Sequence, residues 1–465
     1  MERADQEGFP PERYEPQYLR TLLQPADAED EPFLGWSSAQ IAQVDIALSR
    51  AFFRYAADNL WGQERSWRSR RDWHRIPREI EPVSLLALAL ELDALPSALK
   101  ELPNRQQGYV RLRQSLQRYR QLAALGGWRK IDAGPILHPG ESDIRVSVLG
   151  QRLRLEGDLR EGMEVGDLYS FEIQQGVQRF QQRHGLTADG TLGPLTLQAL
   201  NVPVEHRINQ ILRNMERWRW EKGPSEGAEV KINLADYSLE VIDGEKTLLN
   251  MPVIIGRQER ATPLFVSQIE SLIFSPYWYV PPTLLRETMP RVAVDPQYLK
   301  RNHYEVLDSE GIFQEIAPEY QRKWQQGVID ASLRQQPGPW NPMGEIKFLL
   351  PNSWSIYLHD TPKKSLFSRT QRAFSSGCIR LSQPHKLAHW LLESGHWDSA
   401  AVDAMIASSR SRMVELEQPV DLSIGYWTAW VDDAGRLHFR DDVYGRDQQL
   451  ARELRQEPPL STSLQ

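Results

Sequence analysis

In the first half of the chain, apolar residues recur with the spacing expected of helices. Residues 37–62 and 109–128 each carry such a stripe, which in a globular protein is the face that packs against a core. The stripes contain Ile41, Val44, Ile46, Leu48, Phe52 and Tyr55 in one segment and Val110, Leu112, Leu116, Tyr119 and Leu122 in the other. They predict a helical scaffold, preceded at residues 1–35 by a Pro-, Glu- and Asp-rich lead-in that we expect to be poorly ordered.

A smaller helical unit interrupts this scaffold. Residues 147–159 contain a turn that breaks the helical pattern, and the pattern resumes over residues 169–186. A turn dipeptide then leads to a second short helix at 194–201, with proline in its first turn. The predicted boundaries are 36–166 and 203–222 for the scaffold and 167–202 for an inserted three-helix module.

Beyond a linker at residues 221–229, rich in Gly, Pro, Ser and charge, the period changes to that of strands. Residues 230–256 alternate between apolar and polar positions, and strand-like runs follow at 271–280, 345–351, 355–360 and 425–439. The sequence therefore predicts an α+β multidomain protein whose β-rich domain covers 228–445, with a C-terminal tail at 446–465. A mixed stretch at about 282–341 is long for an insertion in a sheet domain, so we expect it to cap a site.

Composition narrows the possible functions. The formal net charge of -7, with no clustered Lys or Arg, argues against nucleic-acid binding. One cysteine excludes an intramolecular disulfide and a multi-cysteine metal site, and no apolar run is long enough for a transmembrane helix. The N-terminus is charged from its second residue, so no signal peptide is visible, and an exported protein would need a signal or anchor outside this sequence.

The single cysteine, Cys378, follows a glycine in the segment AFSSGCIR. A nucleophilic cysteine needs a base, and His359 lies 19 residues earlier, at the end of a predicted strand. Gly377 lets the backbone approach closely, so N–H groups there could converge on an oxyanion. Against this, a lone cysteine is often a small buried hydrophobe, and His385 and His389 on a predicted helix are nearer in sequence. From these residues alone, the nucleophilic and the buried thiol both remain open.

Two longer patterns resemble known families. From Val230 to Gly445, the order and spacing of INLADYSLEVIDGEKTLLNMPVIIG, ATPLF, YLHDTP and SSGCIRL resemble the catalytic domain of the L,D-transpeptidases, the cysteine enzymes that cross-link peptidoglycan. FQQRHGLTADGTLGPLTLQALN is similar to a small peptidoglycan-binding domain, whose signature stands here as Asp189, Gly190, Gly193, Pro194 and Thr196. Together with the helical half, the chain resembles the large scaffold-bearing Gram-negative members of the transpeptidase family.

The resemblance implies a catalytic set. Cys378 would be the nucleophile and His359 its base, while the third position of the family's triad, here Asp360, would orient the histidine largely through its backbone carbonyl. The backbone of Gly377 and Cys378 would form the oxyanion hole. The usual motif has a histidine where this chain has Ser376, so no role of that histidine carries over.

Four further residues lie near the expected site: Arg380, Tyr357, Ser375 and Ser376. Arg380 matches a family arginine that shapes the site or holds a substrate carboxylate, but it could equally form a structural ion pair. Tyr357 would line the donor cleft or be an ordinary sheet aromatic. Ser375 and Ser376 could supply hydroxyl hydrogen bonds near the thiolate. For the peptidoglycan-binding signature, a glycan groove and a packing module are both compatible with the residues.

The implied activity is acyl transfer in the periplasm without metal or cofactor. The cysteine would release D-Ala from a tetrapeptide stem, form a thioester and pass the acyl group to a second diaminopimelate, giving a 3→3 cross-link. Peptidoglycan stem peptides would be substrates, carbapenems covalent inhibitors, and cell-wall synthesis proteins possible partners. The alternatives on the same scaffold are an L,D-carboxypeptidase and an enzyme that attaches or cleaves a lipoprotein, and the alternative from another class is a non-catalytic cell-wall-binding protein.

Overall fold

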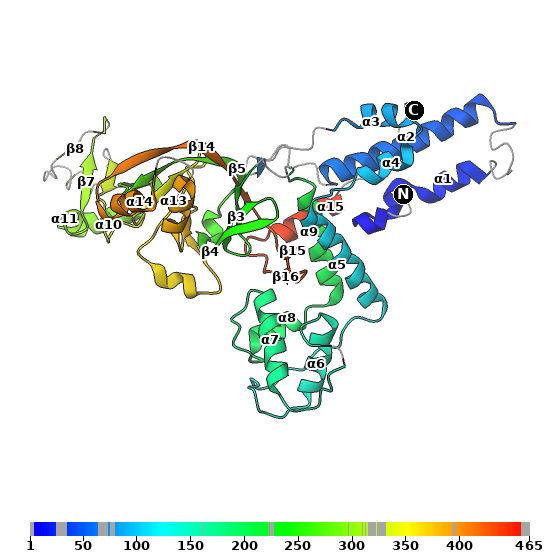
Figure 1. Cartoon of the computed structure of the whole chain (residues 1–465), viewed down its shortest axis with the longest axis horizontal. Helices are drawn as coiled ribbons and strands as arrows, with labels where there is room; N and C mark the ends of the chain where they lie inside the picture. Colours follow the sequence, from blue (N-terminus) through cyan, green and yellow to red (C-terminus); the bar gives the residue numbers. More distant parts are fainter. Residues whose placement is uncertain are drawn as a thin grey trace. The chain divides into compact units, whose positions relative to one another are not determined.

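The computed structural model describes residues 4–24, 35–63, 73–74, 80–160, 162–221, 223, 227–295, 297–308, 310–311, 313–314, 322, 332–393 and 397–456. The chain forms two compact units (Figure 1). The helical unit comprises Met1–Pro224 and Tyr426–Gln465, and the sheet unit comprises Ser225–Gly425. The predicted α+β multidomain class is confirmed. Among the described residues, no helix is both long and apolar enough to cross a membrane.

The helical unit is built from helices, a two-residue strand and one hairpin. Its elements are η1 (Ala4–Glu7), η2 (Pro11–Tyr14), α1 (Pro16–Leu23), α2 (Ser38–Trp61), β1 (Trp73–His74), α3 (Pro82–Glu91), α4 (Leu95–Glu101), α5 (Gln107–Ala124), α6 (Arg145–Leu155), α7 (Phe171–Arg183), α8 (Pro194–Leu200), α9 (Val204–Trp218), β15 (Ala429–Val431), β16 (Leu437–Phe439) and α15 (Arg446–Gln456). Local signals start several helices: Ser37 and Gln40 form a capping box at α2, and Ser170 caps α7.

The expected lead-in differs from the structure. Residues 4–24 form η1, η2 and α1 rather than a poorly ordered segment, while residues 25–34 lie outside the described residues. Phe9 and Tyr14 are each 1% exposed, and the Tyr14 hydroxyl donates to Asp58 in α2 at 3.0 Å. Composition averages over such residues, so it did not show that this polar segment carries buried aromatics.

The small module is larger than residues 167–202. Its core begins at Ile131 and includes Val146, Leu149 and Leu153 of α6. This helix runs to Leu155, and the turn expected within residues 147–159 follows it at Gly157, which has a φ of 81°. Gly150 lies inside this helix, where a Cβ atom would approach Val165 to 2.4 Å. The glycine therefore serves close packing rather than a turn.

The segment after residue 425 was placed in the wrong unit. Residues 426–445 were expected in the β-rich domain, yet β15 and β16 pair with each other and pack in the core formed by α5 and α9 (Figure 1). Asn214 of α9 donates to the Thr428 hydroxyl at 2.8 Å. The residues predicted as a tail form α15 up to Gln456, and residues 457–465 lie outside the described part of the chain.

The sheet unit is organised around one large sheet. Its elements are β2 (Glu229–Asn233), β3 (Ser238–Asp243), β4 (Lys246–Gly256), η5 (Gln258–Arg260), β5 (Leu264–Phe274), β6 (Trp278–Tyr279), α10 (Pro282–Val294), α11 (Tyr298–Arg301), β7 (Tyr304–Leu307), β8 (Phe313–Gln314), β9 (Ser332–Gln335), β10 (Ile346–Leu349), β11 (Leu358–His359), η6 (Lys364–Ser368), β12 (Ala373–Ser375), β13 (Ile379–Leu381), α13 (Pro384–Glu393), α14 (Ser399–Ala407) and β14 (Arg412–Gly425). The strands follow the order β5-β10-β11-β13-β4-β3-β2-β14, and β14 also pairs with β5, which closes the sheet on itself.

The insertion at 282–341 has a core of its own. It contains α10, α11 and the strands β7, β8 and β9, which join β6, just before the insertion, in a second sheet of order β6-β9-β7-β8. Its buried residues are Val280, Leu285, Val292, Leu299, Val306 and Leu333. Its role as a cap stays a prediction.

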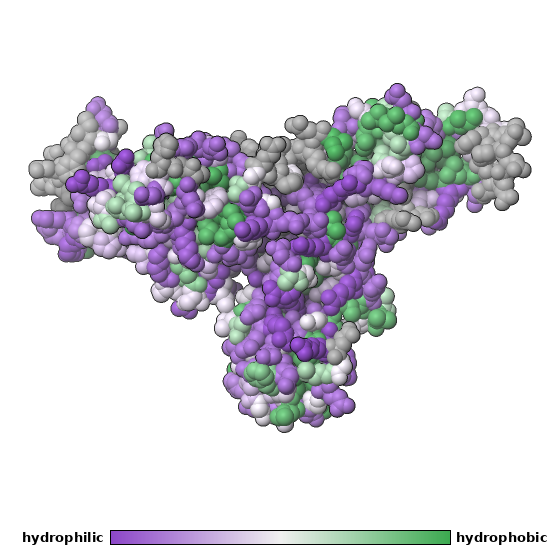
Figure 2. Space-filling model, viewed as in Figure 1, coloured by the Kyte–Doolittle hydropathy of each residue, from purple (hydrophilic) through white to green (hydrophobic). Residues whose placement is uncertain are grey.

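The α3 helix leaves apolar side chains on the surface. Val83, Leu88 and Leu90 are 59%, 53% and 63% exposed. Figure 2 shows the corresponding hydrophobic area over α3.

Candidate active site

Three neighbouring strands of the large sheet bring three basic side chains into one row. In the pairing of β10 with β11, Lys347 lies opposite His359, and in the parallel pairing of β11 with β13, His359 lies opposite Arg380. Residues paired in register share a face of the sheet, and their neighbours along each strand point to the other face. Those neighbours are fully buried: Ile346, Phe348, Leu358, Ile379 and Leu381.

Cys378 lies in the short turn that joins β12 to β13. The Ser375 hydroxyl closes this turn, because it accepts from the Gly377 N–H at 3.1 Å and donates to the Cys378 carbonyl at 2.6 Å. Gly377 has a φ of 124°, a conformation that residues with a Cβ atom rarely adopt. The turn therefore fixes the cysteine by a buried serine and a glycine-specific backbone.

Thr262, which lies between η5 and β5, hydrogen-bonds with the same turn. Its hydroxyl donates to the Gly377 carbonyl at 2.7 Å and accepts from the Gly256 N–H at 3.0 Å. Sequence reasoning missed this residue, although ATPLF was part of the pattern that carried the family resemblance. Thr262 is fully buried, which the structure shows and the sequence does not.

This hydrogen bonding changes the expected oxyanion hole. The Gly377 N–H is already occupied by Ser375, whereas the Cys378 N–H has no partner among the described residues. Of the two expected backbone donors, only the Cys378 N–H is therefore free in this structure to meet developing negative charge. Ser375 holds the backbone and not the sulfur. Ser376 is exposed and accepts from Arg260 at 3.3 Å.

The Cys378 sulfur lies among polar groups of the segment before β11. Both the backbone and the hydroxyl of Tyr357 hydrogen-bond with it, and the thiol faces the Ser355 carbonyl at 3.8 Å. Burial raises the pKa of the Cys378 thiol, while the Tyr357 hydrogen bonds and the charges of Lys347 and Arg380 act to lower it. Tyr357 is therefore in contact with the candidate nucleophile, as a residue lining a donor cleft would be.

His359 is 2% exposed and is held by backbone carbonyls. Its Nδ1 lies 2.5 Å from the Asp360 carbonyl, the contact that the resemblance implies, and the ring also hydrogen-bonds with the Pro342 backbone. Burial, followed by the charge of Arg380, lowers the pKa of His359 to about 3. The imidazole is therefore neutral at pH 7.

No hydrogen bond joins His359 to Cys378 in the structure. The His359 ring is 5.7 Å from the ring of Tyr357, whose hydroxyl contacts the sulfur. Catalytic hydrogen bonds are commonly long without substrate and tighten in the complex. The three residues thus occupy one site, with Tyr357 against both of the others.

The Asp360 carboxylate has a different task from the Asp360 carbonyl. It accepts from the Glu345 N–H at 3.0 Å and forms an ion pair with Lys364. Gly344, with a φ of 61°, makes room for it, since a Cβ there would lie 2.2 Å from Asp360 Oδ2. The side chain fastens the loop, and the carbonyl on the same residue orients His359.

The two cations of the row have no acidic partner among the described residues. Arg380 forms no ion pair there, so the structural ion pair considered from the sequence is not present, and its Nε is buried without a hydrogen-bond partner. Lys347 Nζ lies 3.8 Å from the centre of the Tyr357 ring. Burial lowers the pKa of both Lys347 and Arg380. A carboxylate or thiolate would meet both of these charges.

Lys347 was not among the candidates found from the sequence. The signal was present in EIKFLLP, where one lysine interrupts an otherwise apolar strand. Its place beside His359 follows from the register of β10 against β11, which the sequence alone does not give.

A second cluster near Asp360 has the composition of a metal site. Ligand atoms of Glu345, Asp360 and His385 lie within 4.8 Å of one another, and His385 Nε2 is 2.7 Å from the Glu345 carboxylate. The ammonium of Lys364 already pairs with Asp360, and two of the three residues are exposed. This arrangement is that of a surface charge cluster, and we assign no ion to it.

The peptidoglycan-binding signature forms turn and capping contacts. The buried Gln181 side chain accepts from the Gly190 N–H at 2.8 Å and donates to Asp189 at 2.8 Å and to the Thr196 hydroxyl at 3.0 Å. Gly193 and Pro194 are the N-cap and first residue of α8, as predicted. The signature therefore maintains the module's fold, and Gln181, which sequence reasoning missed, is the residue that joins its parts.

Comparison with known families gives three matches along the chain. Residues 1–116 match the "Scaffold domain", residues 145–200 match the "Putative peptidoglycan binding domain", and residues 227–403 match the L,D-transpeptidase catalytic domain. The chain therefore contains an L,D-transpeptidase catalytic domain at residues 227–403. The match to the catalytic domain contains the Cys378 turn and the row of His359 and its neighbours.

A curated relative of this chain is the "Putative L,D-transpeptidase" of Haemophilus influenzae. It is 30% identical over 222 residues, which are 47% of this chain and 44% of the relative. The alignment thus spans less than half of that relative's length.

Solved structures of transpeptidases show a partial likeness. One from Stackebrandtia nassauensis is 13% identical, with 64% of this chain and 97% of that chain covered and a TM-score of 0.25. One from Xylanimonas cellulosilytica is 15% identical, with 63% and 99% covered and a TM-score of 0.22. A transpeptidase in complex with imipenem is 15% identical, with 43% and 59% covered and a TM-score of 0.20. The family assignment depends on the domain matches and the curated relative.

Proposed function

We propose that this chain is an L,D-transpeptidase that forms 3→3 cross-links in peptidoglycan through a thioester on Cys378. The observation that carries the proposal is the sulfur itself, which sits in a rigid turn, hydrogen-bonds with Tyr357 and lies near two cations that have no acidic partner among the described residues. A buried structural cysteine needs none of these features. The proposal includes a periplasmic location, where peptidoglycan lies.

In the first step, the Cys378 thiol gives its proton to neutral His359, and the thiolate attacks the carbonyl of the diaminopimelate at the third stem position. The negative charge moves to the carbonyl oxygen, which the Cys378 N–H can meet. As the intermediate collapses, the bond to the terminal D-Ala nitrogen breaks. That nitrogen takes the proton from His359, D-Ala leaves, and the acyl group remains on the sulfur.

In the second step, the side-chain amine of another stem's diaminopimelate attacks the thioester. The amine loses a proton to His359, the carbon–sulfur bond breaks, and the sulfur leaves as thiolate, which recovers the proton. The product is an amide between two diaminopimelate residues. The charges of Lys347 and Arg380 act on the Cys378 sulfur, and neither side chain has an acidic partner among the described residues. Both can therefore hold a stem carboxylate while the acyl group is transferred.

Acylation by a carbapenem tests the nucleophile. The drug should add one molecule to the peptide that contains Cys378, and Cys378→Ala should remove that addition while leaving the fold intact. Ser376→Ala is the matched control, because Ser376 is exposed two residues before the cysteine and touches only Arg260 among the described residues. An unmodified cysteine in the wild-type protein would overturn the proposal.

Muropeptide analysis tests the acceptor. After incubation with disaccharide-tetrapeptide, we expect dimers joined 3→3, detected by mass spectrometry. Tripeptide without dimers would instead indicate an L,D-carboxypeptidase, in which water resolves the thioester. A product carrying a lipoprotein fragment would indicate an attaching enzyme. No change with an unacylated cysteine would indicate a cell-wall-binding protein.

A further inference from the structure

The helical unit contains a pocket of about 250 Å³ that the proposed reaction does not use. It lies where the small module meets α5 and the hairpin of β15 and β16. Arg118 of α5, Gly157, Arg179 of α7 and the hairpin residues Arg436 and His438 all line it. The many basic side chains in this lining raise the question of the net charge around the pocket.

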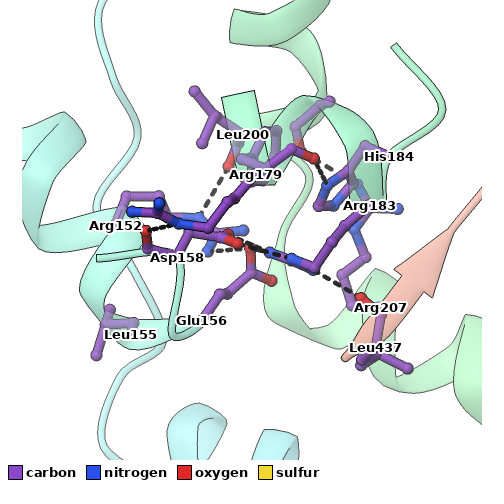
Figure 3. Close-up of polar contacts among 12 residues, drawn as sticks. Arg152, Leu155, Glu156, Asp158, Arg179, Arg183, His184, Leu200, Arg207 and Leu437 are labelled. Atoms are coloured by element: carbon purple, nitrogen blue, oxygen red, sulfur yellow. Dashed lines mark hydrogen bonds and ion pairs between the residues drawn. The ribbon is translucent and has the colours of Figure 1, made fainter. Parts of the chain in front are cut away.

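The inner wall is a buried cluster of charged side chains (Figure 3). Arg183, which is 5% exposed, donates to Asp158 at 2.8 Å, to Glu156 at 3.2 Å and to the Leu437 carbonyl at 2.8 Å. Glu156 also pairs with Arg152 at 2.9 Å and accepts from the Tyr119 hydroxyl at 2.5 Å. These contacts fix the wall of the pocket before any ligand arrives.

The buried cluster has more positive than negative charge. It holds the guanidinium groups of Arg152, Arg183 and Arg207 against the carboxylates of Glu156 and Asp158. Arg207 has no acidic partner among the described residues, and its Nε is buried without a hydrogen-bond partner. Burial lowers the pKa of Arg207 to about 10, so it keeps its charge at pH 7. Burial raises the pKa of Asp158, while the hydrogen bond and charge of Arg183 act to lower it.

The rim adds two further positive charges. Arg118 donates to the Leu155 carbonyl at 2.8 Å, and Arg179 donates to the Asp158 carbonyl at 2.8 Å. Both arginines are exposed, and neither pairs with a carboxylate in the described part of the chain. Backbone contacts orient these side chains but leave their charge uncompensated, so the pocket favours an anionic ligand.

We propose that this pocket binds a carboxylate-bearing segment of the peptidoglycan stem peptide. The choice of ligand rests on the proposed function, while the anionic character rests on the pocket alone. A peptide fits better than a polyphosphate, because Glu156 and Asp158 in the wall repel a multiply charged anion but can attract a peptide's N–H or ammonium groups. The volume also suits one or two amino-acid residues rather than an extended polymer. The module would thus hold the substrate through its peptide, at a place separate from the Cys378 turn.

The test compares two double variants of the full chain, each also carrying Cys378→Ala to prevent turnover. Arg118→Gln with Arg179→Gln removes the two rim charges, and Arg129→Gln with Lys130→Gln removes two exposed charges of the same unit that do not line the pocket. Calorimetry with disaccharide-tetrapeptide should show binding at least about tenfold weaker for the rim variant, because it lacks two charge-assisted contacts. The control variant should bind as the parent does.

Three outcomes would overturn the inference: equal affinity of the rim variant and the parent, an equal loss in both double variants, or competition by inorganic phosphate as strong as by the muropeptide. The catalytic site is the same in all proteins compared, so its own affinity for the stem cancels. Carbapenem acylation of the rim variant with Cys378 restored separates the two proposals. If acylation persists while binding is unaffected, only the pocket assignment fails.

Discussion

Ser375 gives the sharpest test of how the Cys378 turn works. The two serines of AFSSGCIR look equivalent in the sequence, but Ser375 is 3% exposed and makes two hydrogen bonds to the turn, whereas Ser376 is exposed. We therefore expect Ser375→Ala to damage both stability and acylation, and Ser376→Ala to change neither appreciably.

The size of the effect follows from the groups left without partners. Ser375→Ala removes the acceptor of the Gly377 N–H at 3.1 Å and the donor to the Cys378 carbonyl at 2.6 Å. An unsatisfied buried group costs about 1–3 kcal/mol, and water at the partly exposed cysteine relieves some of this, so we expect the sheet unit to lose about 2–4 kcal/mol. A turn that no longer fixes the sulfur should also slow acylation by roughly 10- to 100-fold.

Two measurements check this reasoning. Urea unfolding gives the loss of stability, and mass spectrometry of the intact protein follows carbapenem addition over time. Ser375→Thr keeps a hydroxyl at the same position and should recover most of both properties. If Ser375→Ala acylates at the wild-type rate, then the Ser375 hydroxyl does not position the nucleophile. Faster acylation would instead show that the Gly377 N–H, once released, serves the oxyanion.

Three further variants test other parts of the structure. Lys347→Met should raise the pKa of Cys378 by about one unit and so slow its alkylation by iodoacetamide at pH 7 roughly tenfold. Lys347→Arg keeps the charge and should not change this rate. An unchanged pH profile of alkylation in Lys347→Met would refute the charge effect. Since the pKa of His359 is about 3 when folded and about 6.5 when unfolded, the sheet unit should be most stable above pH 6.5 and lose up to about 4 kcal/mol as the pH falls toward 3. His359→Gln should flatten this slope in pH-dependent unfolding, and an unaltered slope would contradict it. Gln181→Ala should destabilise the helical unit by about 2–4 kcal/mol in urea unfolding, because the buried Gly190 N–H and Thr196 hydroxyl and the exposed Asp189 lose their bonds. A change below about 1 kcal/mol would argue against that role.

The sequence was most informative where the period of apolar residues decides the element. Residues 230–256 alternate, and they form β2, β3 and β4, with Gly244 in the turn between β3 and β4 at a φ of 58°. The cysteine turn and the strand ending in His359 were also located, since both lie in short motifs. Periodicity identifies elements because burial imposes it directly on the sequence.

The sequence did not predict which elements far apart in the chain pack or pair with each other. Residues 429–439 read correctly as strands, but a period of two does not say which core the strands join. Lys347 is next to His359 only through strand register, and the Gly377 N–H is unavailable only because of the direction in which one hydroxyl points. Such facts depend on three-dimensional placement, and no local pattern encodes them.

The position of the β15–β16 hairpin in the sequence determines when the helical unit can complete its core during synthesis. Ala429, Val431, Leu437 and Phe439 belong to the core around α5 and α9, yet the whole sheet unit is translated before them. After α5 and α9 have left the ribosome, their apolar face stays uncovered while some two hundred further residues are synthesised. At ordinary elongation rates this takes about 10–40 s. The sheet unit has all its strands by Gly425 and can fold during that interval. A truncation after residue 425 would therefore leave the site of Cys378 complete but the helical unit open, and such a product would be expected to aggregate through the face that the hairpin normally covers.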